Sequence, residues 1–299
     1  MNIKNVAVAG SGVLGGQIAF QTAFHGFTVK LYDINDEVLA KAKKRFETEL
    51  SENYKTDLKA SEEEIKSTLE RISYTANLAE AVAEADLIIE AIPENVEIKK
   101  DFYHKLAAVA PEETIFATNS STLLPSQFAE DTGRPEKFCA LHFANEIWIY
   151  NTAEIMGHPG TDKVVFDTLV EFAKQIGMVP LEVHKEQPGY ILNSLLVPFL
   201  SAGWNLLVNE VADAKTIDKT WMIATGAPKG PFGFVDMVGL NTVYNIDKNK
   251  AEKTQDPFTI KKVQYIKEHF IDKNKLGMST GEGFYTYPNP EYKQEDFLK

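Results

Sequence analysis

The sequence predicts an α/β protein: a doubly wound, mostly parallel sheet in the N-terminal part, followed by an all-α C-terminal domain. Three observations support this prediction. Short apolar runs alternate with longer amphipathic stretches through the first half, which is the pattern of a parallel sheet covered by helices on both faces. A glycine-rich motif opens the first of these helices. After Pro188 the strand patterns stop.

The expected strands are short and rich in apolar residues. They cover residues 6–9, 27–32, 86–92, 114–118, 138–143, 152–156 and 179–183. The stretches between them carry apolar residues at helical spacing. These predict helices over residues 13–24, 37–50, 96–110 and 163–176. Ser61 and Glu64 have the spacing of a capping box, so a further helix is expected before residue 72.

The character of the chain changes at Pro188. Residues 190–211 are expected to form one long helix that is apolar on nearly every face, with a kink at Pro198. Such a helix must be buried, either in the core of a second domain or between two copies of the chain. We therefore expect a first domain over residues 1–187 and a helical second domain over 188–299.

Composition excludes several classes of protein. The 299 residues carry a formal net charge of −12, which disfavours nucleic acid and anionic lipid as partners. The single cysteine, Cys139, excludes an internal disulfide and a cysteine-cluster metal site, and no metal is expected. No apolar stretch approaches the ~20 residues of a membrane span, and the N-terminus lacks the pattern of a signal peptide. The expectation is a cytoplasmic protein.

Gly10, Gly12 and Gly15 form a G-x-G-x-x-G motif between the first expected strand and the first expected helix. In this context Gly10 makes a tight turn, Gly12 lets the backbone approach a pyrophosphate, and Gly15 lets helix and sheet pack closely. The helix N-terminus at Val13 and Leu14 then offers unpaired N–H groups to the phosphates. The motif therefore predicts a Rossmann-type dinucleotide site.

Asp33 indicates which dinucleotide binds. It ends the second strand, eighteen residues after Gly15, near the spacing of the acid that binds the ribose 2′-hydroxyl. A carboxylate there accepts hydrogen bonds from a ribose diol and repels a 2′-phosphate. Ile34 and Asn35 follow, so no arginine is expected at this point to favour NADP. The predicted cofactor is NAD.

Three polar residues, Ser121, His142 and Glu154, lie at or near strand ends, where an open α/β sheet places its ligand crevice. A dehydrogenase needs a group that takes the alcohol proton as hydride leaves, and histidine suits this role near neutral pH. A carboxylate behind the histidine fixes its tautomer and stabilises the imidazolium. Glu154 fits this role, because a carboxylate inside an apolar strand is costly to bury unless it is paired.

Together these motifs have the order and spacing found in the 3-hydroxyacyl-CoA dehydrogenases, which the chain resembles over essentially its whole length. Besides the glycine motif and Glu154, the resemblance rests on residues 90–95 (EAIPEN), 119–121 (NSS), 142–145 (HFAN), 193–198 (NSLLVP) and 281–287 (GEGFYTY).

The resemblance implies an NAD-dependent oxidoreductase that interconverts 3-hydroxyacyl and 3-ketoacyl compounds. It implies that His142 is the general acid/base and Glu154 its orienting partner. It implies that Ser121 and Asn193 hydrogen-bond the substrate oxygen. It also implies a homodimer formed through the C-terminal domain. The nicotinamide end of the cofactor would be lined by Glu94, Lys99, Asn119 and Asn145.

Two departures from the family pattern bear on the substrate. The family continues His-Phe-Phe-Asn-Pro, whereas here Ala144 opens space beside the histidine and Trp148 is expected to add an aromatic wall to the pocket. In this feature, and in residues 117–126 and 226–232, the chain resembles the diketoreductase branch. That branch implies reduction of 3-keto or 3,5-diketo esters with NADH.

The second departure concerns the helix after Asp33, which in the family offers serine and lysines to coenzyme A. Here it carries Glu47, Glu49 and Glu52, which repel the CoA phosphates; Lys55 and Lys59 are expected to compensate in part. The predicted substrate is therefore a small 3-keto or 3-hydroxy acyl compound, with the CoA thioester left open.

Two alternatives remain at this point. One is a dehydrogenase of a small CoA-free 3-hydroxy acid, similar to the gulonate and carnitine dehydrogenases. The other is a non-catalytic NAD-binding protein, similar to the lens crystallins of this family. The complete set of Ser121, His142, Glu154 and Asn193 argues against the non-catalytic alternative.

Overall fold

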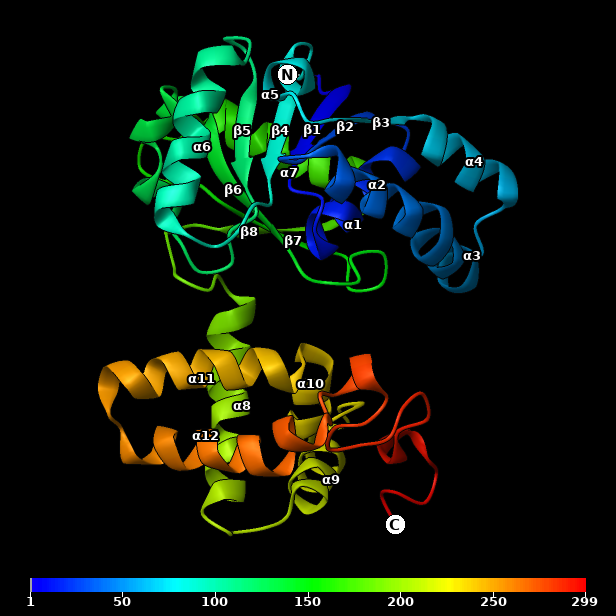
Figure 1. Ribbon diagram of the computed structural model, residues 1–299, viewed down its shortest axis with the longest axis vertical. Helices are drawn as coiled ribbons and strands as arrows, with labels where there is room; N and C mark the ends of the chain where they lie inside the picture. Colours follow the sequence, from blue (N-terminus) through cyan, green and yellow to red (C-terminus); the bar gives the residue numbers. More distant parts are fainter. Residues whose placement is uncertain (1) are drawn as a thin grey trace. The chain divides into compact units, whose positions relative to one another are not determined.

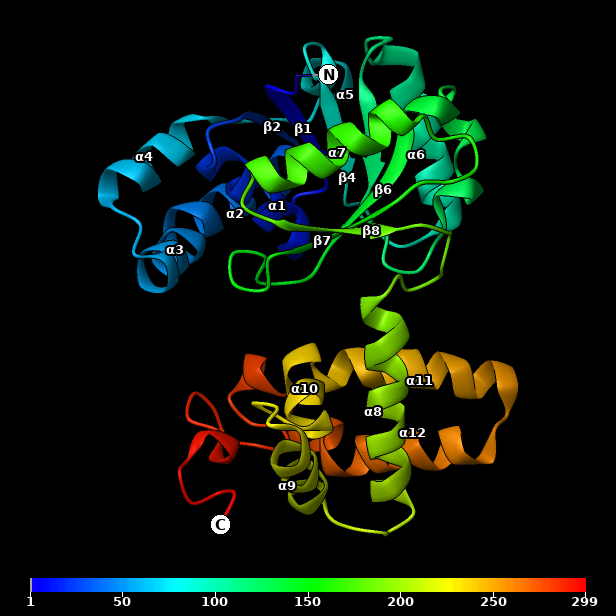
Figure 2. The same ribbon diagram turned by 180° about the vertical axis from the view of Figure 1, so that it is seen from behind.

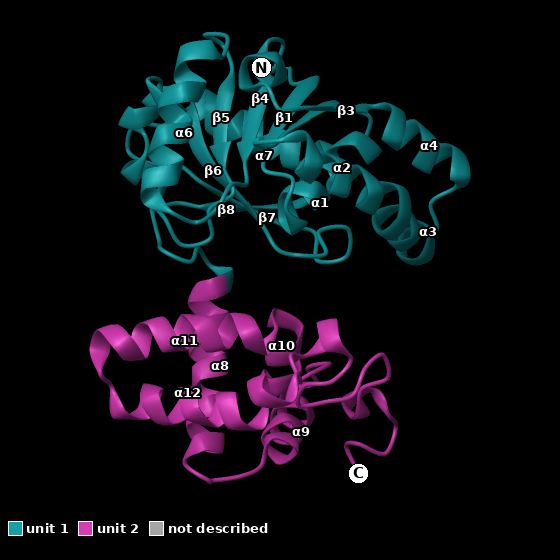
Figure 3. Ribbon diagram, in the orientation of Figure 1, with its two compact units in different colours: residues 1–192 teal, residues 193–299 magenta. Residues whose placement is uncertain are grey.

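The structure is a computed structural model that describes residues 2–299 (Figure 1). It divides into two compact units, residues 1–192 and residues 193–299 (Figure 3). The division falls five residues after the boundary expected at Gln187. No helix among the described residues has both the length and the apolar character that a membrane span requires.

The first unit is built on one eight-stranded sheet with the order β3-β2-β1-β4-β5-β6-β7-β8. Every neighbouring pair is parallel except β6 and β7, which are antiparallel. The strand order reverses between β1 and β4, which is where an open α/β sheet binds its ligand. The strands are β1 (Asn5–Ala9), β2 (Thr28–Tyr32), β3 (Ile72–Thr75), β4 (Leu87–Glu90), β5 (Ile115–Thr118), β6 (Phe138–Phe143), β7 (Thr152–Met156) and β8 (Val179–Val183).

Helices cover both faces of this sheet, which confirms the predicted α/β class. On one face α1 (Val13–Phe24) and α7 (Lys163–Gln175) share a core with the strands, and on the other face α5 (Leu78–Val82) and α6 (Val96–Val109) do so. Figure 1 shows α6 in front of the sheet, and Figure 2 shows α7 in front of it from behind. The central strands are buried on both sides, as their unbroken apolar sequences require.

The helix expected over residues 37–50 is interrupted, which corrects that prediction. Helix α2 (Asp36–Arg45) passes into a π-helical turn, η1 (Phe46–Leu50), and then into α3 (Ser51–Leu58). The hydroxyl of Ser51 donates to the carbonyl oxygen of Phe46, so a side chain satisfies an acceptor of the widened turn. The expected capping box then opens α4 (Glu62–Glu70).

The second unit is helical, as predicted. It contains most of α8 (Leu192–Val208), together with α9 (Ala214–Thr225), α10 (Pro231–Val238), α11 (Leu240–Thr254) and α12 (Pro257–His269). Its core surrounds Trp204, which is 1% exposed. Two buried carboxylates explain the sequence motifs of this unit: Asp218 accepts the N–H groups that open α10, and Asp236 accepts those of residues 284 and 285.

Helix α8 differs from its prediction in both length and burial. It begins at Leu192 rather than at Tyr190, because Tyr190 has a left-handed backbone with φ +54°. Only one end of the helix reaches the core, through residues 203, 204, 207 and 208. Leu195 is 69% exposed and Val197 is 60% exposed. Within the second unit, burial on every face is therefore not achieved.

Candidate active site

His142 and Glu154 face each other because of strand register. The antiparallel pairing of β6 and β7 places the two residues directly opposite one another. His142 Nδ1 lies 3.0 Å from Glu154 Oε2, and His142 Nε2 lies 3.1 Å from Ser121 Oγ. His142 is 4% exposed and Glu154 is 2% exposed. The imidazole thus has a carboxylate behind it and a hydroxyl in front of it, which is an arrangement that can move a proton at Nε2.

The backbone after β8 stabilises the charged form of Glu154. The N–H groups of Ile191 and Leu192 both donate to its Oε1, at 2.8 Å and 2.9 Å. Burial by itself would raise the pKa of Glu154, but the hydrogen bonds from His142, Leu192 and Ile191 lower it below its usual value. The carboxylate is therefore charged at neutral pH and can accept a hydrogen bond from Nδ1–H.

Tyr190 belongs to the same cluster, and sequence reasoning missed it. Its ring stacks on the His142 imidazole with centroids 4.5 Å apart and planes 13° apart. Its hydroxyl donates to the carbonyl oxygen of Ser120 at 2.8 Å. A tyrosine after Pro-Gly carries no pattern that predicts this contact, because the contact joins segments 48 residues apart in the sequence.

The loop that carries Ser121 is fixed by Asn119 and Glu94. Asn119 Oδ1 accepts the N–H of Phe143 at 3.0 Å, which ties the end of β5 to the end of β6. Glu94 Oε1 accepts the hydroxyl of Ser120 at 2.6 Å and both the N–H and the hydroxyl of Thr122. Burial opposes ionisation of Glu94, but these hydrogen bonds and the charge of Lys99 lower its pKa.

Lys99 lies beneath this loop in a buried ion pair. Its ammonium is 2.5 Å from Glu90 Oε1 and 3.5 Å from Glu94 Oε2, and the residue is 1% exposed. Glu90 also accepts hydrogen bonds from Tyr103 and Thr118. A cofactor contact through Lys99 would require this pair to open, so that predicted contact stays a prediction. Asn145 is exposed in the loop after β6.

The glycine-rich loop has the geometry that a dinucleotide requires. Gly10 has φ +100°, and a Cβ there would lie 2.4 Å from the carbonyl oxygen of Ala91. A Cβ on Gly15 would lie 2.0 Å from the carbonyl oxygen of Gly10. A Cβ on Gly12, in contrast, meets no atom within 4 Å. Gly12 precedes α1, whose N-terminus has no side-chain cap, so open space and free N–H groups coincide where a pyrophosphate would lie.

Asp33 and Arg45 both contact Ser11 in this loop. Asp33 Oδ2 accepts the N–H and the hydroxyl of Ser11 at 2.7 Å and 2.6 Å. Arg45 Nη2 donates to the carbonyl oxygens of Ser11 and Gly12 at 2.9 Å and 2.7 Å. The prediction that no arginine is positioned to favour NADP stays a prediction, because these contacts of Arg45 are to backbone carbonyl oxygens. Reading only Ile34 and Asn35 could not find an arginine twelve residues further on, at the end of α2.

Trp148 does not form the aromatic wall that we expected. It is 9% exposed and packs in the core with its ring centroid 5.5 Å from that of Tyr54. Its indole N–H donates to Asp57 Oδ2 at 2.8 Å. The contact joins the β6–β7 loop to α3, a long-range pairing that the local sequence does not show. Asn193 is the first residue of the second unit, and its approach to His142 stays a prediction.

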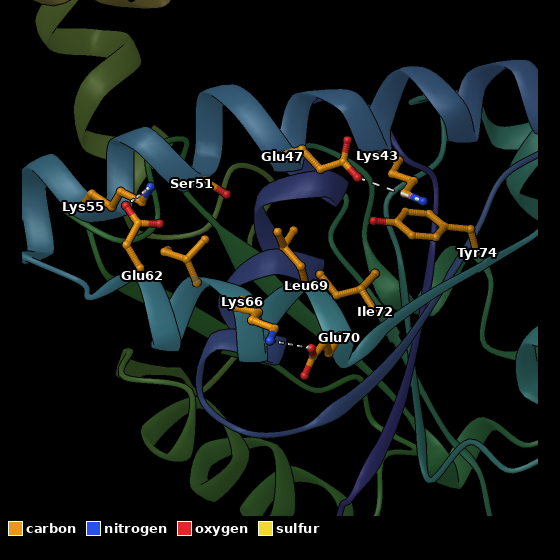
Figure 4. A pocket seen from close by; sticks show the side chains of 11 residues that line it. Lys43, Glu47, Ser51, Lys55, Glu62, Lys66, Leu69, Glu70, Ile72 and Tyr74 are labelled. Atoms are coloured by element: carbon orange, nitrogen blue, oxygen red, sulfur yellow. Dashed lines mark ion pairs between the residues drawn. The ribbon is translucent and has the colours of Figure 1, made fainter.

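A cavity of about 530 Å³ lies among η1, α3, α4 and β3, away from the dyad (Figure 4). Its rim carries three lysines, and each lies close to a glutamate: Lys55 to Glu62 at 2.6 Å, and the others at 4.0 Å and 3.9 Å. The charges of this cavity therefore balance one another. Among residues 2–299, no group of three or more His, Cys, Asp or Glu side chains is placed to hold a metal ion.

Comparison with known proteins agrees with the class that the fold and the loop define, a dinucleotide-dependent oxidoreductase. The 3-hydroxyacyl-CoA dehydrogenase NAD binding domain matches residues 5–187, and the C-terminal domain of the same family matches residues 189–287. The chain is 36% identical to human mitochondrial hydroxyacyl-coenzyme A dehydrogenase over 290 residues, which is 95% of this chain and 91% of that protein.

Two further relatives agree with this assignment. Identity to a probable 3-hydroxybutyryl-CoA dehydrogenase of Bacillus subtilis is 31% over 291 residues, covering 96% of this chain and 98% of that protein. A solved diketoreductase structure, described in terms of dual catalysis of dicarbonyl compounds, is 55% identical with a TM-score of 0.91 and covers 96% of this chain and 100% of that one. The chain belongs to the 3-hydroxyacyl-CoA dehydrogenase family and is an NAD-dependent oxidoreductase.

Proposed function

We propose that the protein reduces the 3-keto group of a β-keto acyl compound, and oxidises the 3-hydroxyl in the reverse direction, with His142 as general acid/base. One observation carries this proposal. A buried imidazole lies between a charged carboxylate and a hydroxyl at the carboxyl end of a sheet whose switch point holds a dinucleotide loop. This arrangement supports placing the proposed active site and the cofactor site at one edge of the sheet in the first unit.

Each residue of the cluster has a separate role in the reduction. When bound, NADH supplies the hydride that reaches the 3-carbon. The imidazolium of His142 donates its Nε2 proton to the substrate oxygen as negative charge develops there. Glu154 holds Nδ1 and stabilises the imidazolium before the transfer. Ser121, already within hydrogen-bond reach of Nε2, donates to the same substrate oxygen, and Asn193 is proposed as a second donor.

NADH is expected to bind more tightly than NADPH by at least ~2 kcal/mol. With NADPH, Asp33 repels the 2′-phosphate and also loses the charge-assisted hydrogen bond that it accepts from the ribose 2′-hydroxyl of NADH. Asp33→Ala should narrow this gap. The guanidinium of Arg45 remains beside Ser11 in that variant and attracts the added phosphate. The measurement is the Kd of each reduced cofactor by fluorescence titration. Equal Kd values for the unaltered protein would contradict the assigned role of Asp33.

We further propose that the preferred substrate lacks coenzyme A and is a 3-keto or 3,5-diketo ester. The surface on which the family holds CoA is acidic here and is not neutralised. Glu49 and Glu52 are exposed and form no ion pair within residues 2–299. Of the two lysines expected to compensate, Lys55 pairs with Glu62, and Lys59 donates to a backbone carbonyl and forms an ion pair with neither Glu49 nor Glu52. The phosphates of CoA would therefore meet two carboxylates that have no ion-pair partner within residues 2–299.

NADH oxidation measured side by side with acetoacetyl-CoA and a 3,5-diketo ester tests this proposal. The ester is expected to have a kcat/KM at least equal to that of the thioester. Changing Glu49 and Glu52 together to lysine should improve the thioester alone, and so should added salt, because salt screens repulsion between exposed charges. The matched control changes Asp167 and Glu171 on α7 to lysine, which alters the net charge by the same amount at another face.

If acetoacetyl-CoA is preferred a hundredfold, with no gain from the lysine pair, the substrate is an ordinary 3-hydroxyacyl-CoA and the ester proposal is wrong. Activity confined to a small polyol acid without CoA would instead indicate a gulonate- or carnitine-dehydrogenase-like enzyme.

We propose that the protein is a homodimer formed through its helical unit. The support is apolar surface that this unit leaves exposed: Leu195 and Val197 on α8, Ile223 on α9 and Ile246 on α11, exposed by 59% to 69%. Sedimentation velocity measures the mass in solution, and a monomer at micromolar concentration would contradict the proposal. A cytoplasmic location also stays a proposal, which cell fractionation tests, since the human relative is named mitochondrial.

A further inference from the structure

We propose that Tyr190 is a positioning residue of the catalytic dyad: its ring fixes the plane of the His142 imidazole and favours the imidazolium that donates the proton. This inference rests on the role of His142 proposed above. It assigns a function to a residue that neither the glycine motif nor the dyad explains, and that lies outside both in the sequence.

The Tyr190 ring is buried against the imidazole and held at its hydroxyl end. Tyr190 is 1% exposed and lies parallel to His142 at 4.5 Å. Its hydroxyl is fixed to the carbonyl oxygen of Ser120, the neighbour of the serine that contacts His142 Nε2. Burial raises the pKa of Tyr190 well above its usual value, so the hydroxyl stays protonated and remains a donor. The aromatic face and the Ser121 hydroxyl are thereby held in register with the imidazole.

The backbone at Tyr190 is strained, and the strain serves the same site. A bulky residue at φ +54° is an outlier of a kind that clusters at functional sites. Gly189 before it is also left-handed, at φ +79°. This turn directs the ring onto His142 and directs the next two N–H groups, those of Ile191 and Leu192, onto Glu154. One turn therefore holds both members of the dyad.

The stack affects protonation through the ring face. An aromatic face attracts a cation, and the attraction is stronger where water is excluded. Two other groups face the imidazole: the carboxylate of Glu154 on β7 and the hydroxyl of Ser121 after β5. Around Tyr190 lie Glu90, Glu94 and the thiol of Cys139, whose pKa burial raises to about 12, so that the thiol is neutral. Lys99 pairs with Glu90. The ring is thus an uncharged group of this cluster that stabilises the imidazolium through its face, whereas Ser121 contacts the imidazole edge at Nε2.

Three variants separate this role from simple packing. Tyr190→Leu removes the ring but keeps a Cβ-bearing residue in the same backbone conformation. Tyr190→Phe removes only the hydroxyl. Phe172→Leu, in the core contributed by α7, is the packing control because it removes a buried ring that does not touch the dyad. If Tyr190→Leu does not fold, Tyr190→Met replaces it as a flexible filler.

Two readouts are needed. In the reductive direction the imidazolium is the reactant. The alkaline limb of the kcat/KM profile should therefore move down by about half a pH unit or more in Tyr190→Leu, since ~0.7 kcal/mol corresponds to that shift. Its kcat should fall severalfold, with the Kd of NADH within about twofold of the parent. Tyr190→Phe and Phe172→Leu should keep the alkaline limb at the pH of the parent protein.

NMR of the cofactor-free protein should show His142 ring protons shifted upfield by the stacked ring. In Tyr190→Leu, the pH midpoint of their titration should fall.

The outcomes distinguish the two proposals. If the unaltered protein shows no upfield shift, or if folded Tyr190→Leu keeps both the titration of His142 and the alkaline limb of the parent, the positioning role of Tyr190 is wrong. If the NMR titration of His142 shifts in Tyr190→Leu but turnover and its pH profile do not change, the effect of the Tyr190 ring on His142 is supported. The catalytic role of His142 is then refuted instead.

Discussion

Replacing His142 with alanine is expected to lower kcat by a factor on the order of 10²–10⁴, the usual share of general acid–base catalysis. The imidazole Nε2 is the proton-transfer atom that the geometry brings beside the Ser121 hydroxyl. The Kd of NADH should change by less than about twofold, because the glycine-rich loop and Asp33 are untouched. Steady-state kinetics with a β-keto substrate and a fluorescence titration with NADH provide the two measurements.

Glu154→Gln is the companion variant to His142→Ala. It keeps the shape of the side chain but removes the charge that holds the imidazolium proton. Oxidation requires the neutral imidazole, so the acidic limb of its kcat/KM profile should move to lower pH. The direction of this shift follows from the lowered pKa of Glu154, which keeps its carboxylate ionised across the working pH range. The variant therefore loses a negative charge that favours the imidazolium of His142. Near-normal turnover in His142→Ala would refute the dyad.

Gly12→Val is expected to abolish measurable NADH binding, with a loss of affinity of at least ~100-fold, while the protein remains folded. A Cβ at Gly12 meets no protein atom within 4 Å, and the backbone there is extended with φ −60° and ψ −169°. The Cβ of valine therefore meets no protein atom, and the side chain is expected to occupy the space that the pyrophosphate needs. About 2.7 kcal/mol of lost binding corresponds to this factor.

The matched control for Gly12→Val is Gly15→Val. There a Cβ would lie 2.0 Å from the carbonyl oxygen of Gly10, so this variant should lose thermal stability as well as cofactor binding. The contrast assigns close approach to Gly12 and helix packing to Gly15. Circular dichroism melting with NADH titration measures both properties. A Gly12→Val protein that binds NADH normally would show that the dinucleotide does not lie over this loop.

The sequence predicted those parts of the site that depend on local pattern and on strand ends. Ser121 and His142 were found because polar residues ended apolar strands, and the pairing of His142 with Glu154 followed once β6 and β7 lay antiparallel. Those parts that depend on long-range packing were not predicted. Tyr190 reaches His142 from 48 residues away, and Arg45 reaches the glycine loop from the end of α2.

The fold shows the same division between local and long-range features. The periodicities predicted seven of the eight strands and the longer helices between them, because each of these elements buries one face or both faces in a regular way. The short strand β3 was not predicted. The π-helical turn at Phe46–Leu50 leaves the apolar spacing almost unchanged, so periodicity could not reveal it. The exposed faces of Leu195 and Val197 were expected to be buried, since apolar character indicates that a surface is covered but not what covers it.

Hydride transfer to the 3-carbon is tested most directly by following the hydrogen itself. The protein is incubated with NADH deuterated at C4 of the nicotinamide and with a 3,5-diketo ester, and the product is examined by mass spectrometry and NMR. The NADH carries deuterium at both C4 positions, so either hydride that is transferred is labelled. The predicted result is one deuterium on the carbon that bears the new hydroxyl, with the label absent from the His142→Ala reaction over the same time. A reduced product without deuterium, or with deuterium on another carbon, would contradict the proposed reaction.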